Sequence, residues 1–333
     1  MSTEPLLRVE DLESHFFTSA GVVRAVDKVS FHVDAGETVA IVGESGCGKT
    51  VTALSILSLV PDPGKVVGGQ VWFRGRDVLG MNRHEIQDFR GSEVAMIFQD
   101  PMTSLNPVLK IGFQIKETMT AHHRFDRSQA AARVVPLLNK VRIPEAAWRA
   151  RDFPHQFSGG MRQRAMIAMG LANEPALLIA DEPTTSLDVT VQAQIIELLR
   201  DINRDLGTAV ILITHNLAIV ASLCSRVIVM YGGRVVESGS TTQIFEHPQH
   251  PYTWSLLQSI PRLDQPRDQL LTIAGLPPDL RRPPSGCLFH PRCRFRVERC
   301  LKEEPPLVEV SPGHWARCWV TMKKALADEP TRG

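Results

Sequence analysis

Short runs of β-branched and other apolar residues alternate with helical patterns along most of the chain. Strand-like runs occupy residues 37–43, 176–182 and 208–215, and apolar residues recur at helical spacing within 50–60 and 191–207. Buried strands that alternate with amphipathic helices are typical of an α/β domain. The pattern therefore predicts an α/β fold with a largely parallel sheet.

Two regions inside this domain depart from the alternation. The Val-rich runs at 6–12 and 21–33 precede the first parallel strand and predict an antiparallel β subdomain at its edge. Between about 106 and 157 the strand signals vanish, and Ala, Arg, Leu and Gln dominate. We expect a helical subdomain there.

The composition and the hydrophobic pattern of the chain change again near residue 246. Regular periodicity is lost, and 13 of the 23 prolines lie from Pro248 onward. A chain of 333 residues has room for about two domains. We therefore expect one domain at 1–246 and a small, loop-rich extension at 247–333.

Composition and charge narrow the class of protein. With 43% hydrophobic and 22% charged residues the chain is typical of a globular protein, and a net charge of +1 does not favour nucleic acid or a bare anionic membrane as partner. The first residues lack a secretory-signal pattern, so we expect a cytosolic protein. The most apolar stretch, 209–224, is interrupted by polar residues. Any work at a membrane would then require a partner.

The segment after the first parallel strand has the chemistry of a phosphate-binding loop. It matches G-x-x-x-x-G-K-[ST] and consists of Gly43, Glu44, Ser45, Gly46, Cys47, Gly48, Lys49 and Thr50. Glycines let backbone N–H groups surround phosphates, the lysine reaches the β- and γ-phosphates, and the threonine is a ligand for Mg²⁺. The sequence predicts a nucleoside triphosphate site.

The strand-like run at 176–182 ends in two carboxylates, Asp181 and Glu182. A first acid at a strand end can hold Mg²⁺, and a second can orient or deprotonate an attacking water. The pair alone is a weak signal, but together with the phosphate-binding loop it predicts nucleotide hydrolysis.

A second glycine-rich segment, 158–164, comes before this strand and offers a hydroxyl and N–H groups at a helix N-terminus. With Ser158, Gly159 and Gly160 in this order, the chain resembles the ATP-binding cassette (ABC) ATPases over about residues 6–246. The resemblance implies the P-loop fold of an ABC nucleotide-binding domain. It also implies that this signature segment completes the ATP site of a facing subunit.

The resemblance extends to further positions and implies a role for each. Gln99 resembles the Q-loop glutamine, which adds a Mg²⁺ ligand to Thr50 and Asp181, and His215 resembles the switch histidine that contacts the γ-phosphate. Segment 186–188 resembles the D-loop, whose Asp188 would act on the opposite site. Phe16 would stack on adenine, and Thr52 would add an ATP contact. Glu182, His215, Gln99 and Lys49 are the implied catalytic set.

Several positions depart from the family pattern. Phe157 stands before the signature serine and Met161 follows the glycines, but the phosphate-binding groups are intact. Cys47 replaces a commoner serine. Because it lies near a helix N-terminus, we expect a lowered thiol pKa, inhibition of hydrolysis by alkylation and protection by bound ATP.

The segments around these motifs, and above all the HPYT element at 250–253, resemble the ATPases of oligopeptide/dipeptide importers. The resemblance then runs to about Val320. It implies a second ATPase subunit, a homologue or a copy of this chain, and two membrane permease subunits docked near Gln99 and the helical subdomain. It also implies an extracytoplasmic solute-binding protein and a place on the cytoplasmic face of a bacterial membrane. The solute itself stays open: peptide, nickel, opine, glutathione or oligosaccharide.

Four of the six cysteines fall within the extension: Cys287, Cys293, Cys300 and Cys318. Their spacing lacks the C-x₂-C pairs usual in zinc sites, which leaves zinc, an iron–sulfur cluster or plain thiols open. Six arginines near the first three would stabilise thiolates or an anionic cluster. The family resemblance favours a [4Fe–4S] cluster. Cys224 has no assigned role and is expected to be buried.

Two other classes of function fit the sequence less well. A soluble ABC ATPase acting on nucleic acid or the ribosome would combine similar sites with metal-binding cysteines, but this chain has one cassette, no heptad run and near-neutral charge. A metabolic P-loop kinase would leave the signature segment unexplained. Peptide or related solute import powered by ATP is therefore the leading prediction.

Overall fold

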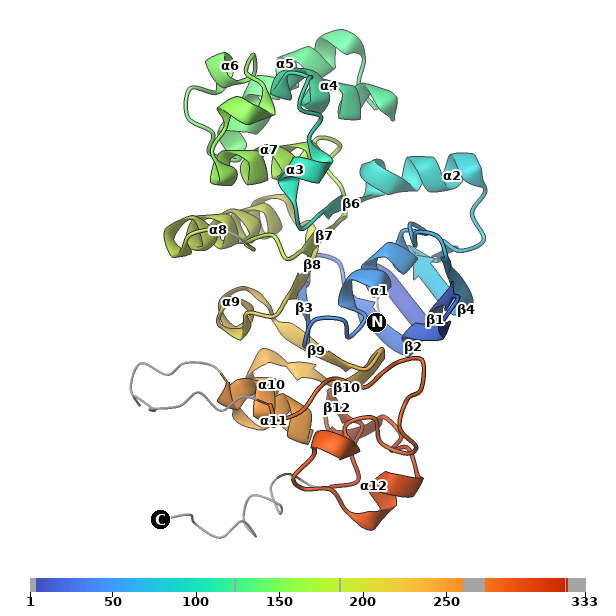
Figure 1. The fold of residues 1–333 in the computed structure, drawn as a ribbon. Coiled ribbons are helices and arrows are strands. Elements are labelled where there is room, and N and C mark those ends of the chain that lie inside the picture. The colour runs from blue at the N-terminus through green and yellow to red at the C-terminus, as the bar shows by residue number, and fades with distance from the viewer. Residues whose placement is uncertain (1–3, 123, 186, 260–272, 321, 323–333) are drawn as a thin grey trace. The chain divides into compact units, whose positions relative to one another are not determined.

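The computed structural model describes residues 4–122, 124–185, 187–259, 273–320 and 322. Its contacts divide the chain into two compact units. The first is built around Gly80–Ile213, and the second combines Leu7–His32 and Val39–Leu79 with the chain from Thr214 onward. Figure 1 labels the elements of both.

The first unit contains the strands that the sequence predicts at 176–182 and 208–215. β7 (Leu177–Asp181) pairs in parallel with β6 (Val94–Ile97) and with β8 (Ala209–Thr214). All five residues of β7 are buried, as continuous apolar strands in parallel sheets are. This arrangement confirms the α/β prediction for this part of the chain.

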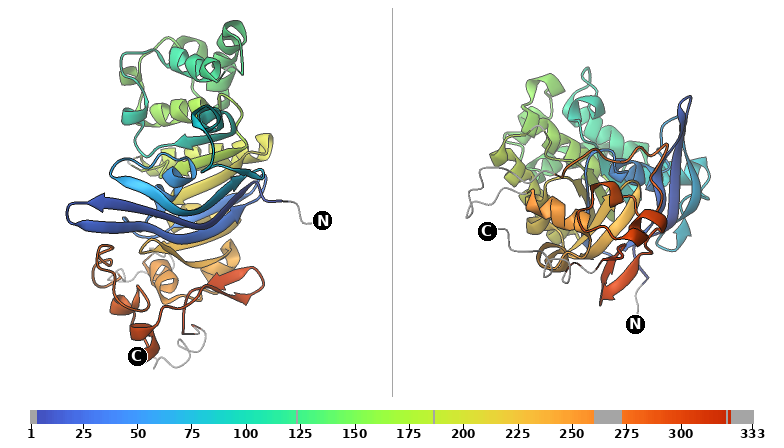
Figure 2. Two further views of the ribbon diagram at one scale, coloured as in Figure 1. Left: turned by 90° about the vertical axis from the view of Figure 1, so that its right-hand side faces the viewer. Right: turned by 60° about the horizontal axis from the view of Figure 1, so that its bottom comes forward.

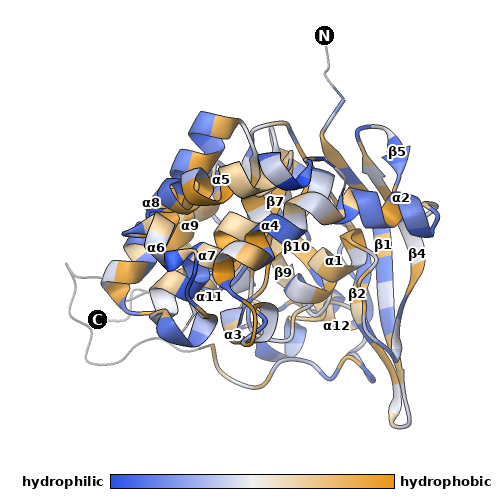
Figure 3. Ribbon diagram, turned by 90° about the horizontal axis from the view of Figure 1, so that it is seen from above, coloured by the Kyte–Doolittle hydropathy of each residue, from blue (hydrophilic) through white to orange (hydrophobic). Residues whose placement is uncertain are grey.

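Two longer helices of this unit carry motif residues at their starts. α7 (Gly159–Leu171) follows the signature serine, and α8 (Val189–Leu206) follows Asp188. α8 is amphipathic, with Ile195 and Leu199 buried, and Figure 3 shows both hydropathy colours along it. It ends at Gly207, whose left-handed backbone supplies the expected stop.

The segment predicted as helical contains helices among its described residues. α4 (Ile111–Ala121), α5 (Arg127–Lys140), α6 (Ala146–Arg149) and the 3-10 turn Pro154–Gln156 occupy it. Asp126 begins α5 with a reciprocal capping box with Gln129. The short elements α2 (Arg83–Asp88), the irregular turn Phe89–Glu93 and α3 (Pro101–Ser104) come earlier in the chain.

The second unit contains the predicted antiparallel subdomain. Its strands lie in the order β2 (Gly21–Val33), β1 (Leu7–Thr18), β4 (Gly64–Phe73) and β5 (Arg76–Asp77), with β1 and β5 each antiparallel to β4. The long blue strands in Figure 2 belong to this sheet.

The other strands of the second unit join the nucleotide loop to the C-terminal extension. β3 (Thr38–Val42) pairs in parallel with β9 (Arg226–Tyr231), and β9 pairs antiparallel with β10 (Arg234–Ser240). β10 then pairs with β12 (His314–Ala316), and β12 with β11 (Val308–Ser311). The last two strands come from the extension, so the extension continues the sheet to which β3, β9 and β10 belong.

The helices of the second unit are short. They are α1 (Lys49–Ile56), α9 (Leu217–Leu223), α10 (Thr241–Glu246), α11 (Pro251–Gln258), the 3-10 turn η3 (His290–Arg292) and α12 (Glu298–Lys302). The expected boundary after residue 246 falls between α10 and α11, and both sides belong to one compact unit. Within the described residues, we find no helix with the length and apolarity needed to span a bilayer.

Candidate nucleotide site

The phosphate-binding loop connects the end of β3 to the start of α1, as the sequence predicts. Gly43, Gly46 and Gly48 all have positive φ angles. A Cβ on Gly43 would lie 2.3 Å from the carbonyl oxygen of Met230, and a Cβ on Gly48 would lie 2.3 Å from that of Ala25. Backbone approaches this close admit only glycine at these two positions.

Lys49 lies inside this loop with only 6% of its surface exposed. Its ammonium group donates hydrogen bonds to the carbonyl oxygens of Gly43 at 2.8 Å and of Glu44 at 3.0 Å. The loop is therefore wrapped around a cation at a helix N-terminus, an arrangement that suits phosphate.

The other predicted ATP contacts of this loop differ in exposure. Ser45, Gly46 and Thr50 are exposed. Thr52 is fully buried, and its hydroxyl donates to the carbonyl oxygen of Gly48 at 2.9 Å. It therefore supports the loop from within helix α1.

The expected lowering of the Cys47 pKa is wrong. The residue is 5% exposed, and burial raises the pKa of its thiol, although nearby Lys49 acts in the opposite direction. Because the sulfur lies 2.7 Å from the point where a Cβ on Gly43 would be, it fills the loop as a packing group. Cys224 is also buried, as expected, and burial raises its pKa to about 12.

The first unit brings Gln99 and Glu182 together. The Gln99 amide donates to the Glu182 carboxylate at 3.0 Å, and the Thr185 hydroxyl donates to the same carboxylate oxygen at 2.9 Å. Glu182 follows β7 with a φ of 45°, a conformation that non-glycine residues rarely adopt. Asp181, at the end of β7, is 3% exposed. Thr185 is a contact that sequence reasoning missed, although its position three residues after Glu182 suits a turn.

The signature segment lies at an exposed helix start in the same unit. The Ser158 hydroxyl caps α7 by accepting from the Met161 N–H at 3.3 Å, and Ser158 and Gly159 are exposed. Gly160 lies against α8, since a Cβ there would be 2.7 Å from Val191. Asp188 caps α8 through the Val191 N–H at 2.9 Å. Ser186 of the predicted D-loop lies outside the described residues.

Phe16 and His215 are placed in the second unit. Phe16 is half-buried on β1 and lies opposite Gly64 of β4, where a Cβ would be 2.7 Å from the Phe16 ring. His215 is exposed and follows β8 directly. Their adenine and γ-phosphate roles stay predictions.

The HPYT element contacts the phosphate-binding loop. Tyr252 of α11, Tyr231 of β9 and Phe289 of the extension are each at most 2% exposed, and their ring centroids lie 4.5 to 5.4 Å apart. The Tyr252 hydroxyl accepts the Glu44 backbone N–H at 2.7 Å. Sequence reasoning used this element only to identify the family and missed its contact with the loop.

A buried carboxylate ties the HPYT element to the sheet. Glu237 of β10 is fully buried and accepts from the N–H groups of Gln249 at 2.6 Å and His250 at 2.9 Å. It also pairs with His314 of β12 at 2.8 Å. His250 is neutral, because burial, followed by the charge of Arg317, lowers its pKa to about 3.

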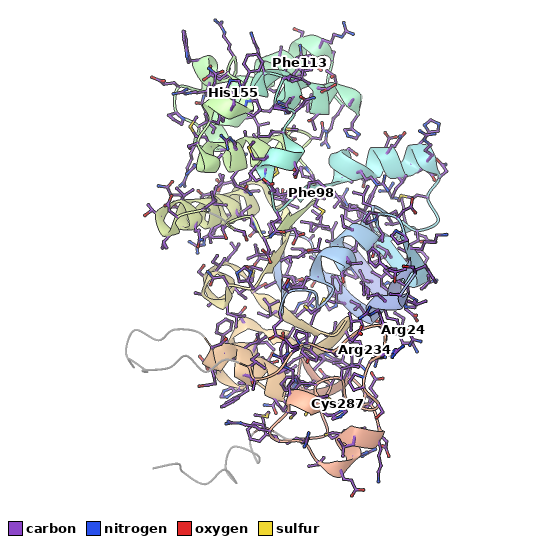
Figure 4. All side chains as sticks on the ribbon, in the orientation of Figure 1. Arg24, Phe98, Phe113, His155, Arg234 and Cys287 are labelled. Atoms are coloured by element: carbon purple, nitrogen blue, oxygen red, sulfur yellow. The ribbon has the colours of Figure 1, made fainter. Side chains whose placement is uncertain are left out.

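Arg234 makes a second link between the extension and the sheets. It donates to Asp27 of β2 at 2.7 Å and forms an ion pair with Glu304 of the extension. Arg317 pairs with the same Glu304 at 3.0 Å. Arg234 and Cys287 are labelled in Figure 4.

The four extension cysteines are not joined by disulfides. Backbone N–H groups hydrogen-bond three of the sulfurs, including that of Cys318, which accepts from Val320 at 3.3 Å. Burial nevertheless raises the pKa of Cys287, Cys293 and Cys318, the last two to about 12. Across the described part of the chain, no three His, Cys, Asp or Glu side chains are grouped so as to hold one metal ion.

Four of the six arginines around these cysteines are engaged elsewhere, whereas the charge of Arg296 opposes the burial that raises the pKa of Cys293. Arg281 pairs with Asp279, Arg292 with Glu44 and Arg299 with Glu303. Arg294 stacks 4.2 Å from the centroid of the Trp254 ring. These four arginines therefore form ion pairs and ring contacts instead of stabilising thiolates.

Comparison with known proteins finds relatives over nearly the whole chain. Residues 26–185 match the family described as ABC transporter, and residues 236–300 match the family described as oligopeptide/dipeptide transporter, C-terminal region. A probable peptide ABC transporter ATP-binding protein of Sinorhizobium fredii is 52% identical over 94% of each chain. The oligopeptide transport ATP-binding protein OppD of Bacillus subtilis is 49% identical over 98% of this chain and 91% of its own. The dipeptide transport ATP-binding protein DppD of Escherichia coli is 48% identical over 94% and 96%.

Solved structures agree on the fold. A dimeric ATP-binding cassette in a post-hydrolysis state with ADP and phosphate superposes with a TM-score of 0.64 at 25% identity, over 71% of this chain and 98% of its own. The ABC transporter component cbiO1 of Clostridium perfringens gives 0.63 at 27% identity, over 74% and 92%. These matches confirm the predicted ABC nucleotide-binding fold. The chain belongs to the ATP-binding proteins of the oligopeptide/dipeptide ABC transporter family.

Proposed function

We propose that this chain is the ATP-hydrolysing subunit that powers import of peptides, or of related small solutes, through a separate membrane permease. The observation that carries the proposal is the pairing of Gln99 with Glu182 at the ends of parallel strands, in a chain that also wraps a phosphate-type loop around Lys49. Relatives named as oligopeptide and dipeptide transport ATP-binding proteins support the substrate class.

We assign a part of the nucleotide chemistry to each predicted residue. Lys49 and the N–H groups of the loop bind the phosphates, and Phe16 stacks on the adenine. Glu182 orients and polarises the attacking water, and His215 holds the γ-phosphate. The buried carboxylate of Asp181 and the side-chain oxygens of Thr50 and Gln99 are ligands of the kind that Mg²⁺ prefers. When bound, the ion would neutralise charge on the phosphates.

The signature segment acts on a second ATPase subunit. Ser158, Gly159 and Gly160 lie at the start of a helix of 13 residues, where two of them are exposed and the N–H groups favour an anion. We assign them, with Asp188, to the ATP bound by the facing subunit, which is a homologue or a copy of this chain. Closure of two such subunits on ATP would drive the permease.

The remaining partners follow from the same family. Two permease subunits would dock near Gln99 and the helical subdomain, and an extracytoplasmic binding protein would deliver the solute. The chain would then lie at the cytoplasmic face of a bacterial membrane. Its relatives' names as transport ATP-binding proteins support this arrangement.

The extension is assigned a [4Fe–4S] cluster on Cys287, Cys293, Cys300 and Cys318. Four thiols without a disulfide, three of them hydrogen-bonded by backbone N–H groups, are donors of the kind such a cluster uses. Among the described residues no three of them are grouped to hold one metal ion, so the assignment requires the thiols to converge when a cluster binds. Zinc is the alternative. Anaerobic purification with visible absorbance and metal analysis tests both: a colourless protein free of iron and zinc would remove the metal assignment.

The ATPase assignment is tested on the chain purified with the proteins that accompany it. We expect Mg²⁺-dependent ATP hydrolysis that is lost in Lys49→Ala, together with stoichiometric co-purification of membrane subunits. The matched control is Lys302→Ala, on the surface of α12, where the lysine pairs with Glu298. Hydrolysis that survives in Lys49→Ala, or a chain that co-purifies with nucleic acid instead, would overturn the proposal.

A further inference from the structure

The phosphate-binding loop is held by an ion pair from the extension. Arg292, in the 3-10 turn η3, donates to both carboxylate oxygens of Glu44, with Nη1 at 2.6 Å from Oε2 and Nη2 at 2.9 Å from Oε1. The arginine side chain is 4% exposed and that of Glu44 25%. Such a two-point pair fixes orientation as well as charge.

The guanidinium of Arg292 is itself fixed by other contacts. It donates to the carbonyl oxygens of Ala274 at 3.0 Å and Ile273 at 3.1 Å, and to the Tyr231 hydroxyl at 3.3 Å. Hydrogen bonding to Glu44 outweighs the opposing effect of burial and raises the pKa of Arg292. The group that holds Glu44 therefore has one defined position within the extension.

Glu44 connects this pair to the phosphate-binding lysine. Its N–H is held by Tyr252 at 2.7 Å, and its carbonyl oxygen accepts from Lys49 at 3.0 Å. The side chain, N–H and carbonyl of one loop residue thus contact Arg292, Tyr252 and Lys49. Movement of η3 would change the loop that surrounds the lysine ammonium.

We propose that Arg292 is a positioning residue for ATP, which sets the conformation and the charge of the phosphate-binding loop through Glu44. Without Arg292, the Glu44 carboxylate would be an unpaired negative charge in a loop that must receive phosphates, so it would weaken ATP binding. The extension would then control ATP affinity. This inference rests on the proposed ATPase function.

The test is a double-mutant cycle on KM for Mg·ATP and on kcat, measured with the full chain in its complex. Arg292→Gln should raise KM about tenfold and change kcat less than about twofold, because the residue does not touch the reacting atoms. Glu44→Gln removes the unpaired charge, so the double variant should recover most of the lost affinity. Arg292→Lys should give an intermediate KM, since lysine restores charge without the two-point geometry.

The matched control is Arg281→Gln. Arg281 also contacts both oxygens of one carboxylate, that of Asp279, but its side chain is 47% exposed and its partner lies within the extension. Its KM should equal that of the wild type. If Arg292→Gln does not fold, Arg292→Lys tests the same link, because it keeps the charge but loses the two-point contact and should raise KM by a smaller factor with kcat preserved.

The outcomes separate this inference from the proposed function. Two results would overturn the role of Arg292 while the ATPase assignment stands. One is a KM of Arg292→Gln equal to that of Arg281→Gln. The other is an increase in KM that remains just as large when Glu44→Gln is added to Arg292→Gln. Absence of ATP binding and hydrolysis by the wild-type complex would overturn the proposed function itself.

Discussion

Gln99 donates a 3.0 Å hydrogen bond to the carboxylate of Glu182. The two residues follow β6 and β7, neighbouring parallel strands whose carboxyl ends share one edge of the sheet. A polar amide and a carboxylate held together at this edge are suited to position a water molecule for attack on a phosphate.

Glu182→Gln should abolish turnover without abolishing ATP binding. The amide keeps the shape of the side chain but lacks the negative charge that polarises water, so kcat should fall by at least about 100-fold. Steady-state hydrolysis and equilibrium ATP binding measure the two effects. Glu197→Gln, on the exposed face of α8, is the control and should behave as wild type. Normal hydrolysis by Glu182→Gln would remove this residue from the mechanism.

Cys47 should react slowly with alkylating reagents at neutral pH. Its thiol is buried and its pKa is raised, so little thiolate is available. Mass spectrometry after timed iodoacetamide treatment should show labelling at least about 100-fold slower in the native protein than in urea. Labelling at the rate of a free thiol would contradict the raised pKa and would support the lowered pKa expected from the helix N-terminus.

His250 should make the protein less stable in acid. Its native pKa is about 3, below the ordinary value near 6.5, so only the unfolded chain binds a proton between these values. The free energy of unfolding should therefore fall by about 1 kcal/mol between pH 7.5 and 5.5 through this group. Urea unfolding at both pH values measures the loss.

His250→Asn is the matched variant for this effect. His250 caps α11 by accepting the Tyr252 N–H at 3.0 Å, and asparagine can accept the same hydrogen bond without titrating. The free energy of unfolding of the variant should fall by about 1 kcal/mol less than that of the wild type over this pH range. Equal losses in both proteins would show that His250 is not the source.

Glu237→Ala should destabilise the second unit. The substitution leaves two N–H groups and the buried His314 without their acceptor, which should lower the free energy of unfolding by about 3 kcal/mol. Thermal or urea unfolding measures it. Glu309→Ala is the control, because that exposed side chain accepts one N–H, from Gly313, and should change stability by about 1 kcal/mol or less. Similar losses in the two variants would contradict a special role for Glu237.

Local sequence patterns predicted the features that depend on neighbours along the chain. The alternating apolar runs located β3, β7 and β8, and the glycine pattern located the loop around Lys49. Gln99 and Glu182 were predicted through the order of family motifs. The strands and the loop each depend on a short segment whose periodicity or turn chemistry is visible in the residues themselves.

Features that depend on tertiary packing were not predictable in the same way. Arg292 and Glu44 lie 248 positions apart, and the Pro-rich extension has no periodicity that would indicate a contact with the loop. The pKa of Cys47 was expected to fall because a helix N-terminus is visible in sequence, whereas the burial that raises it depends on the whole fold.

The most direct test of the proposed function is accumulation of a labelled peptide by proteoliposomes that contain the purified complex, with Mg·ATP inside and binding protein outside. Wild-type complex should accumulate peptide only with hydrolysable ATP, and the Glu182→Gln complex should accumulate none. Accumulation that does not require ATP hydrolysis, or an active ATPase complex that moves neither peptides nor related small solutes, would contradict it.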